Sequence, residues 1–373
     1  MTSSSTYIVH EWIEGVGGAE KVLNEFARMF PNSDIRCLWN SAPGQHVELD
    51  RRTTPSVIGR IGLRNKALTL PFMSPVWRTM KLDSADWILV SSHLFAHHIA
   101  ASRPDIPTFV YAHTPARYIW YPELDTRSAR VPLVRPLLKT LREYDRYCVT
   151  KGNAKYAANS RYVRDRISAC WNVESDVIYP PVEVDKIIGV RDWTNEVTGT
   201  EQGILDNLPE TFVLGASRFV PYKRLDLVIE AAARVGVDVV LAGSGPDRLK
   251  LEQIAERAGT RCLFVDRPSD SLLYALYQRA EAYVFPAIED FGIMPVEAMA
   301  AGAPVITGSL GGATESVIDK KTGVHLAEWD QSSFDSALRL CSQLKGEAPR
   351  LRAAEFSNLR FEERIKTWMH SVL

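Results

Sequence analysis

The chain alternates short apolar runs with segments of helical periodicity along nearly its whole length. In the first half the runs are TYIVH, WILVSS, TFVYAH and AKYAANS, and residues 19–30 form the first helical pattern. In the second half the runs are TFVLGAS, DVVLAGSG, RCLFVD, AYVFPA and APVIT. Such alternation predicts an α/β fold with parallel sheets covered by helices on both faces, in which ligands bind beyond the carboxyl ends of the strands.

The length of 373 residues exceeds what one ordinary core supports and suits two domains with a cleft between them. The stretch VIYPPVEVD separates the two series of apolar runs, and its paired Pro180 and Pro181 favour an extended backbone over a helix. We therefore expect one domain over residues 1–180, a second over residues 181–356, and a final helical segment over residues 357–373.

The cysteine pattern and the apolar content favour a reducing, cytoplasmic location. The five cysteines are an odd number, lie far apart and form no C-x-x-C pair, which disfavours a disulfide framework and a zinc site. The amino-terminal segment has no basic region ahead of an apolar core, and no run of about 18 apolar residues occurs anywhere. Neither an export signal nor a spanning helix is therefore expected.

Basic residues are concentrated in residues 51–82, although the net charge of the whole chain is only -1. This stretch contains no Asp or Glu, and its basic residues are Arg51, Arg52, Arg60, Arg64, Lys66, Arg78 and Lys81. Its interleaved apolar residues include Leu63, Leu68, Leu70, Phe72, Met73 and Trp77. The mixture favours docking on an anionic membrane surface, with a solvated face over a core helix as the alternative. Nucleic-acid binding is disfavoured because the overall charge balance is not basic.

A glycine-rich junction follows the first apolar run, which ends at His10. Gly15, Gly17 and Gly18 lie where a strand is expected to pass into a helix, a place where glycines tolerate positive φ and free N–H groups can meet an anion or a sugar oxygen. A tight turn without a ligand is the alternative. A dinucleotide fingerprint would need a further glycine at the position of Glu20, so a nicotinamide cofactor is disfavoured.

Two cations follow the strand TFVLGAS in the second half. Arg218 and Lys223 come after this strand and before the amphipathic segment that starts at Leu225. Paired cations at the carboxyl end of a strand suit a diphosphate leaving group, whose developing charge they can stabilise. Ordinary surface cations would show the same spacing.

Two carboxylates flank a glycine in the segment AIEDFGIMPVEAMAAGAPVI. Glu289 and Glu297 are separated by seven residues, and a helix is expected to start near Pro295, because proline suits a first turn. The backbone N–H groups ahead of that helix can meet hydroxyls or phosphate, and they belong to Phe291, Gly292 and Ile293. A helix-start charge at Glu297 and a loop carboxylate at Glu289 are the simpler interpretations.

Together these motifs resemble the family 4 glycosyltransferases. The pattern E-x7-E of Glu289 and Glu297 and the R-x4-K spacing of Arg218 and Lys223 occur in the family's order, after a glycine loop that also looks like the family's own. The strand DVVLAGSGP and the ending FSNLRFEERIKTWMHSVL extend the resemblance over nearly the whole chain. The resemblance implies a GT-B fold, with two Rossmann-like domains facing each other across a cleft and a C-terminal helix that crosses back to the N-terminal domain.

The resemblance also assigns roles to individual residues. It implies that Arg218 and Lys223 bind the diphosphate of a nucleotide-sugar donor, with the N–H groups of residues 291–293 nearby. Glu297 would bind the ribose and Glu289 would face the transferred hexose, while Gly17 and Gly18 would line the opposite side of the cleft.

Members of the family place a histidine near the reacting sugar, and His113 in TFVYAHTPARYIWYPE is the best match, at the end of an expected strand. A hydrogen-bonded structural histidine is the alternative for this position. His93, His97 and His98 are expected to be structural or to face a helix, and no role is assigned to His46, His325 or His370.

The blocks HTPARYIWYPE and HEWIEGVGGAEKV look most like a branch that includes mannosyltransferases of bacterial polysaccharides. The resemblance thus implies a retaining transferase without cofactor or metal, which moves mannose from GDP-mannose to a glycan acceptor. The basic, apolar stretch 51–82 suggests that the acceptor is polyprenol-linked and that the protein acts in the cytoplasm or at the inner face of the membrane. UDP-sugars remain open as donors. An epimerase of the same fold and a non-catalytic nucleotide-sugar-binding protein remain as alternatives.

Overall fold

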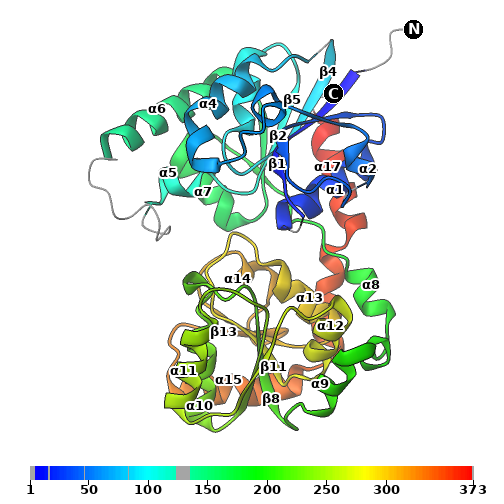
Figure 1. Ribbon diagram of the computed structural model, residues 1–373, viewed down its shortest axis with the longest axis vertical. Helices are drawn as coiled ribbons and strands as arrows, with labels where there is room; N and C mark the ends of the chain where they lie inside the picture. The colour runs from blue at the N-terminus through cyan, green and yellow to red at the C-terminus, as the bar shows by residue number, and fades with distance from the viewer. Residues whose placement is uncertain (1–4, 16, 46, 83, 123–134, 372–373) are drawn as a thin grey trace. The chain divides into compact units, whose positions relative to one another are not determined.

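The computed structural model describes residues 5–15, 17–45, 47–82, 84–122 and 135–371 (Figure 1). The chain folds into two compact units. The first unit comprises Met1–Pro181 together with Phe361–Leu373, and the second comprises Val182–Arg360. Two units built on parallel sheets confirm the predicted α/β fold class.

The first unit is built on a seven-stranded sheet with the order β3-β2-β1-β4-β5-β6-β7. All of its strand pairs are parallel. The strands are β1 (Ser5–Ile13), β2 (Asp34–Asn40), β3 (Thr53–Pro55), β4 (Ala85–Ser92), β5 (Thr108–Ala112), β6 (Lys155–Ala158) and β7 (Asp176–Val177). The four apolar runs of the first half lie in β1, β4, β5 and β6, as predicted.

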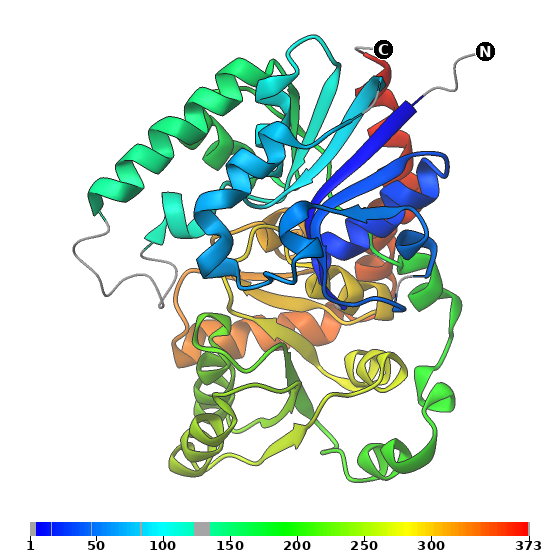
Figure 2. The ribbon, with the colours of Figure 1, turned by 45° about the horizontal axis from the view of Figure 1, so that its top comes forward.

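Helices cover both faces of this sheet. They are α1 (Gly18–Met29), α2 (Val47–Asp50), α3 (Val57–Arg60), α4 (Lys66–Thr79), η1 (Ala96–Ser102), α5 (Arg117–Trp120), α6 (Arg135–Gly152), α7 (Arg161–Trp171) and α17 (Asn358–His370). Figures 1 and 2 show α6, in green, and α17, in red, on opposite sides of the sheet.

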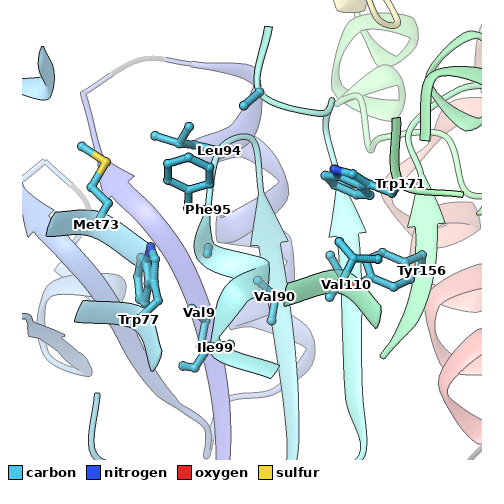
Figure 3. Close-up of a cluster of buried hydrophobic side chains, with 14 of the residues drawn as sticks. Val9, Met73, Trp77, Val90, Leu94, Phe95, Ile99, Val110, Tyr156 and Trp171 are labelled. Carbon is cyan, nitrogen blue, oxygen red and sulfur yellow. The ribbon is translucent and has the colours of Figure 1, made fainter. Parts of the chain in front are cut away.

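Strand alternation sorts the core of the first unit into two clusters. Val9, Val90 and Val110 point into the cluster under α4, η1, α6 and α7, where they meet Trp77 and Trp171 (Figure 3). The residues next to them in sequence, Ile8, Leu89 and Phe109, point to the opposite face with α1 and α17. Because successive strand residues face opposite sides, two adjacent polar residues at a strand end are also sent to different faces.

The C-terminal helix α17 packs on the sheet of the first unit, which confirms the predicted return of the chain. The ring of Phe361 stacks on Phe26 of α1, with 5.6 Å between ring centroids. The ring of Trp368 meets Phe109 edge-on at 5.3 Å. Such aromatic pairs contribute about 0.5–1.5 kcal/mol each beyond the apolar area that they bury.

The second unit contains a six-stranded parallel sheet with the order β10-β9-β8-β11-β12-β13. Its strands are β8 (Phe212–Ala216), β9 (Asp238–Ala242), β10 (Cys262–Val265), β11 (Ala282–Phe285), β12 (Val305–Gly308) and β13 (Gly323–Leu326). The five apolar runs of the second half lie in β8 to β12, as predicted. The backbone at Pro180 and Pro181 is not helical, which also agrees with the sequence.

The α-helices of this unit are α8 (Val184–Gly189), α9 (Gln202–Asp206), α10 (Leu225–Val235), α11 (Arg248–Ala258), α12 (Asp270–Arg279), α13 (Ile293–Ala301), α14 (Ala313–Ser316), α15 (Gln331–Leu344) and α16 (Glu347–Ala353). Short 3-10 turns are η4 (Trp193–Glu196), η5 (Gly199–Glu201), η6 (Pro221–Lys223) and η7 (Ala354–Phe356). Their apolar faces and the inward residues of β8, β9 and β11 form the core.

The basic stretch 51–82 is only partly a surface feature. Met73 and Trp77 are fully buried in the core of the first unit, contrary to a uniformly exposed face. The guanidinium of Arg52 donates to four backbone carbonyls, those of Ala27, Phe30, Pro31 and Ser33, at and beyond the end of α1. The ammonium of Lys66 lies 2.6 Å from the carboxylate of Glu14. Part of the predicted patch is therefore structural.

Candidate functional site

The sequence motifs of the second unit meet at the point where the order of its strands reverses. β8 lies between β9 and β11 in the sheet, so the loops that follow β8 and β11 leave the carboxyl edge as neighbours. Arg218 and Lys223 lie on the first of these loops, and Glu289 lies on the second. Such a switch point is the usual ligand position in open α/β sheets.

Lys223 and Glu289 form an ion pair across these two loops. Lys223 is 9% exposed, and its ammonium lies 6.0 Å from the ring centroid of Phe285 at the end of β11. The pair is therefore largely shielded from water, which strengthens its attraction but also raises the cost of removing either partner. The structure thus brings together two of the predicted site residues that lie far apart in the sequence.

Arg218 occupies a different environment from Lys223. It is exposed, and its guanidinium donates a hydrogen bond of 2.7 Å to the hydroxyl of Tyr222, which is itself 41% exposed. One buried cation and one exposed cation thus project from the same loop. An exposed guanidinium can turn toward an anionic ligand without first losing a buried partner.

Two glycines after β9 hold the cation-bearing loop in place. Gly243 and Gly245 have φ values of +135° and +157°. A Cβ on Gly243 would lie 1.9 Å from the carbonyl oxygen of Ser217, and one on Gly245 would lie 2.4 Å from that of Phe219. Only glycine permits this close approach, so the segment GSG fixes the backbone that carries Arg218.

Helix α13 begins at Ile293, two residues before the predicted start at Pro295. Gly292 adopts a left-handed conformation, with φ of +89°, and turns the chain into the helix ahead of Pro295. Phe291 is buried, and the backbone N–H of Gly312 donates to the carbonyl of Glu289 at 2.8 Å. The loop that carries Glu289 is therefore anchored on both sides.

Glu297 lies in the first turns of α13 and is only 6% exposed. Burial raises the pKa values of Tyr274, Tyr277 and Tyr283, and the nearby charge of Glu297 adds to this effect. The hydroxyl of Tyr283 donates to the carbonyl of Ala216 at the end of β8. Tyr283 thus connects the surroundings of Glu297 with the end of β8.

In the first unit, the glycine loop leads into α1 without the positive φ values that the sequence suggests. Gly17 is the N-cap of α1 and is extended, with φ of -175°. Neither Gly15 nor Gly18 is among the glycines of positive φ, and Val16 lies outside the described residues. What the glycine provides is room: a Cβ on Gly17 would lie 2.1 Å from the carboxylate of Glu20. That carboxylate accepts the backbone N–H of Glu14 at 3.1 Å.

His113 follows β5 and belongs to a hydrogen-bonded row across three strands. Its Nε2 lies 2.8 Å from Oγ of Ser91, and the same Oγ lies 3.0 Å from Nδ1 of His10. Nε2 of His10 is buried and has no hydrogen-bond partner among the described residues. Burial and the neighbouring His93 and His10 hold the pKa of His113 well below its usual value. The row is therefore uncharged at neutral pH.

Glu11, next to His10, is fully buried and turns to the other face of the sheet. Its carboxylate accepts the backbone N–H groups of Leu94 and Ala96 at 2.8 Å each, and that of His93 at 3.2 Å. It also accepts the hydroxyl of Ser92 at 3.2 Å. Burial would raise the pKa of Glu11, but the nearby imidazoles and backbone N–H groups outweigh it and lower this pKa.

The three histidines that the sequence groups together lie in two places. His97 and His98 are fully buried in η1, whereas the side chain of His93 is 23% exposed. The ring of His93 lies 5.7 Å from that of His10 and 6.3 Å from that of His113. His93 thus joins the strand-end histidines. The sequence signals for this group are the dipeptide His10–Glu11 and the run SSH, each at the end of a strand.

Among the described residues, His97, His98 and Asp145 form the one group whose ligand atoms could surround a metal ion. Nε2 of His97 and Nε2 of His98 lie 3.0 Å and 2.7 Å from the same carboxylate oxygen of Asp145. The other oxygen accepts the indole N–H groups of Trp120 and Trp171 at 2.7 Å and 2.8 Å. Hydrogen bonds therefore already satisfy the carboxylate on both sides.

Two family models match the two halves of the chain. Residues 16–186 match the model described as Glycosyltransferase Family 4. Residues 201–355 match the model described as Glycosyl transferases group 1. The motifs around Arg218 and Glu289 lie in the region that matches the group 1 model. His93 and His113 lie in the region that matches the family 4 model.

Curated relatives resemble about half of the chain. An uncharacterized glycosyltransferase of Methanocaldococcus jannaschii is 27% identical over 189 residues, which are 48% of this chain and 48% of that protein. D-inositol 3-phosphate glycosyltransferase of Mycobacterium tuberculosis is 30% identical over 187 residues, which are 46% of this chain and 37% of that protein. The chain thus spans about half or less of the length of these relatives.

Solved structures resemble the whole chain. HepE of Anabaena, crystallised with UDP, has a TM-score of 0.71 at 18% identity and covers 99% of this chain and 100% of its own. Sucrose-phosphate synthase of Thermosynechococcus elongatus has a TM-score of 0.73 at 16% identity and covers 99% of both chains. At these identities the likeness concerns the fold. The first part of the chain thus matches a family 4 glycosyltransferase model and the second part a group 1 glycosyltransferase model, and the fold is of the GT-B type.

Proposed function

We propose that the chain is a retaining glycosyltransferase that moves a hexose from a nucleotide sugar to an acceptor hydroxyl without a metal ion. The observation that carries this proposal is the meeting of Lys223 with Glu289 at the switch point of the second sheet, with Arg218 on the same loop as Lys223. The matches to glycosyltransferase models over both units support it.

The proposed chemistry follows from the charges at this point. When the bond from the sugar C1 to the phosphate oxygen breaks, negative charge grows on the departing diphosphate, and the cations of Arg218 and Lys223 would stabilise it. Each charge-assisted hydrogen bond of this kind contributes about 1.5–3 kcal/mol. The acceptor oxygen attacks C1 from the face that the phosphate leaves, and its proton passes to the departing phosphate oxygen. Glu289 would orient the hexose through its hydroxyls, and Glu297 the ribose.

In the first unit, we assign His113 to the reacting sugar. Because its Nε2 is engaged with Ser91 and its pKa is well below the usual value, His113 is a neutral imidazole at neutral pH. A neutral imidazole can exchange hydrogen bonds with an uncharged hydroxyl without attracting the diphosphate. This suits a sugar hydroxyl better than a phosphate group.

The donor is proposed to be GDP-mannose, on the motif resemblance in HTPARYIWYPE and HEWIEGVGGAEKV. UDP-glucose is the second candidate, because HepE of Anabaena, a protein of the same fold, was crystallised with UDP and with UDP-glucose. A thermal-shift screen of GDP, UDP, ADP and TDP with their sugar conjugates, in excess EDTA, separates the two. A ligand at 100 times its dissociation constant stabilises the folded state by about 2.7 kcal/mol. No response to any nucleotide would contradict the transferase assignment.

We also propose that α3 and α4 dock the first unit on an anionic membrane, which would place a lipid-linked acceptor near the enzyme. Among the described residues, no helix combines the length and apolar character needed to cross a bilayer. Four large apolar residues of this region are nevertheless exposed, namely Val57 (66%), Ile61 (70%), Leu68 (64%) and Phe72 (56%). Exposed basic residues accompany them, namely Arg51, Arg60, Arg64 and Lys81.

Vesicle sedimentation tests this docking proposal. Binding should require anionic lipid and should weaken when Arg51, Arg60 and Arg64 are all changed to Glu, because each basic residue near an anionic surface contributes about 1 kcal/mol. The control is a Lys250→Glu and Arg257→Glu variant on α11 in the second unit. Equal binding of wild type to zwitterionic and anionic vesicles, or no effect of the triple change, would remove the proposal.

A further inference from the structure

A chain of hydrogen bonds runs through the buried core of the first unit, from Asp145 on α6 to the loop after β4. Nε2 of His97 lies 3.0 Å from Asp145, and Nδ1 of His97 lies 3.1 Å from Oγ of Ser92. Oγ of Ser92 lies 3.2 Å from the carboxylate of Glu11. All four side chains are at most 1% exposed. Because successive strand residues face opposite sides of a sheet, this series of hydrogen bonds lies on the opposite face from the row of His10, Ser91 and His113.

The hydroxyl of Ser92 fixes the direction of the bonds on one side of His97. Glu11 accepts three backbone N–H groups besides this hydroxyl, so it is a carboxylate that can only accept. Ser92 has a single hydroxyl hydrogen and must donate it to Glu11. Its oxygen can then only accept from His97, which requires a proton on Nδ1 of His97.

The carboxylate of Asp145 fixes the direction on the other side. It takes two indole N–H groups on one oxygen and two imidazole nitrogens on the other. The hydrogen bonds and charges of the two imidazoles outweigh burial and hold the pKa of Asp145 well below its usual range, so it accepts as an anion. His97 must therefore also carry a proton on Nε2. An imidazole with protons on both nitrogens is a cation.

His98 differs from His97, although both reach the same oxygen of Asp145. Nδ1 of His98 lies 2.6 Å from Oγ of Ser74, whose hydroxyl donates to that of Tyr144 at 3.4 Å and reaches no carboxylate in the described structure. Because the bond to Tyr144 is long and its acceptor is uncharged, Ser74 can turn its hydrogen to Nδ1 of His98, which then needs only its Nε2 proton. Burial and the neighbouring His97 lower the pKa of His98 to about 4, so it is neutral at neutral pH.

We propose that His97 is a buried imidazolium and a positioning residue, held between two carboxylates so that Glu11 fixes the loop that presents His93 beside His113. The proposal rests on the function proposed above and adds His93 and its supports to the residues of that site. With its second proton, His97 orients Ser92, and Ser92 completes the set of donors that holds Glu11. Without that proton, Glu11 loses one donor and the loop from His93 to Ala96 loses part of its anchor.

The surroundings of His97 contain few other titratable groups that could exchange its proton. Trp171 of α7 packs against its ring at 4.5 Å between centroids, and His98 packs at 4.5 Å. Tyr156 of β6 lies near Asp145, and burial raises its pKa, so it stays uncharged. From β1 the facing charged group is Glu11, and from α6 it is Asp145. Asp145 contacts the ring of His97 directly, and Glu11 is connected to it through Ser92.

Nitrogen NMR of protein labelled at the histidine ring tests the protonation directly. The expected spectrum at neutral pH has both ring nitrogens of His97 in the protonated position and one unprotonated nitrogen on His98. A His97→Gln variant assigns the signals, and a His98→Gln variant is its partner. An unprotonated nitrogen on His97 at neutral pH would overturn the proposal. This readout does not depend on knowing the donor or on any transferase activity.

Two buried serines provide matched variants for the positioning role. Ser92→Ala removes the hydroxyl that connects His97 with Glu11. Ser74→Ala removes the hydroxyl on α4 that contacts Nδ1 of His98. We expect similar losses of thermal stability, but only Ser92→Ala should lower turnover, by roughly 10-fold, with little change in the apparent KM for the donor. Ser92→Ala should also remove one proton from His97 in the spectrum.

Equal turnover in the two serine variants, with both folded, would reject the positioning role even if His97 proved to be cationic. If the wild-type protein transferred no sugar from any nucleotide donor, the proposed function would fail instead. In that case the nitrogen spectrum would still decide the protonation of His97.

Discussion

The ammonium group of Lys223, after β8, is paired with the carboxylate of Glu289, after β11. A cation proposed to meet a diphosphate is thus held in place by an anion proposed to face the sugar. Binding of a donor would exchange one anionic partner of Lys223 for another, in a place that is mostly shielded from water. The carboxylate of Glu289 thus compensates the charge of the largely buried ammonium group.

Changing Lys223 to Ala should lower turnover roughly 10- to 100-fold, because one charge-assisted hydrogen bond to the leaving group is lost. The matched control is Arg224→Ala. Arg224 is the next residue in the chain, and its guanidinium lies 3.2 Å from the carboxylate of Asp226. Steady-state kinetics check the prediction, and equal turnover in the two variants would contradict the role of Lys223.

Changing Glu289 to Gln should separate binding from turnover. The variant keeps the side-chain size but releases Lys223 from its ion pair, so we expect a nucleoside diphosphate to bind several-fold more tightly while turnover falls. Calorimetric titration with GDP and UDP measures the affinity. Glu281→Gln serves as control, because Glu281 lies 3.9 Å from Lys345 in a pair away from the motif. Weaker nucleotide binding in Glu289→Gln would speak against competition between the carboxylate and the phosphate.

Stability should fall as the pH drops from about 6.5 toward about 4. Burial lowers the pKa values of His10 and His113, and burial with His97 lowers that of His98 to about 4. In this pH range the histidines bind protons in the unfolded chain but not in the folded one. The free energy of unfolding therefore falls by up to about 1.4 kcal/mol per pH unit for each such group. The contribution is fully present above pH 6.5.

Urea unfolding at a series of pH values checks this slope. His98→Gln should flatten it between about pH 6.5 and pH 4. An identical slope in wild type and His98→Gln would show that His98 already binds its proton in the folded state.

Transfer should proceed at an unchanged rate in excess EDTA, because the proposed charge stabilisation comes from Arg218 and Lys223. Addition of Mg²⁺ or Mn²⁺ after chelation should then have no more than a small effect. Radiolabelled donor and a purified glycan acceptor give the rate. A strict requirement for one of these ions would replace the cation mechanism with metal-assisted departure of the nucleotide.

Phe361→Ala should destabilise the first unit by about 3–5 kcal/mol, because it empties a buried space between α17, α1 and the sheet. Phe361 is 1% exposed and its ring stacks on Phe26. Leu359→Ala on the same helix is the control, because Leu359 is 61% exposed and should change stability by less than about 0.5 kcal/mol. Thermal unfolding measures the change of stability in each of the two variants, and equal changes would contradict the packing role of Phe361.

The strands could be predicted where they are buried and uninterrupted in the sequence, as in β4 and β8. β2 escaped prediction because Asp34 and Arg36 interrupt its apolar pattern, DIRCLWN. β3, β7 and β13 are short strands at sheet edges, where one side has no neighbouring strand and the pressure for apolar residues is weaker.

The positions of Arg218, Lys223 and Glu289 on the loops after β8 and β11 were predictable, because these residues follow apolar runs. The pairing of Lys223 with Glu289 was not, since the residues lie 66 positions apart and meet only through the order of β8 and β11 in the sheet. The row from His10 to Ser91 depends in the same way on β1 and β4 being neighbours. The prediction of positive φ values in the glycine loop was wrong, because the sequence does not distinguish a glycine that makes room for Glu20 from one that adopts positive φ.

In the first sheet, two adjacent dipeptides, His10–Glu11 and Ser91–Ser92, each send one residue to either face. A single-residue deletion in β1 ahead of His10 would exchange the faces of the imidazole and the carboxylate, so that neither would meet its serine partner on β4. A graft of these hydrogen-bonded residues onto another protein must therefore transfer both dipeptides and keep the register between β1 and β4. Because of this coupling, few sequence changes in these dipeptides can alter one face of the sheet and leave the other face unchanged.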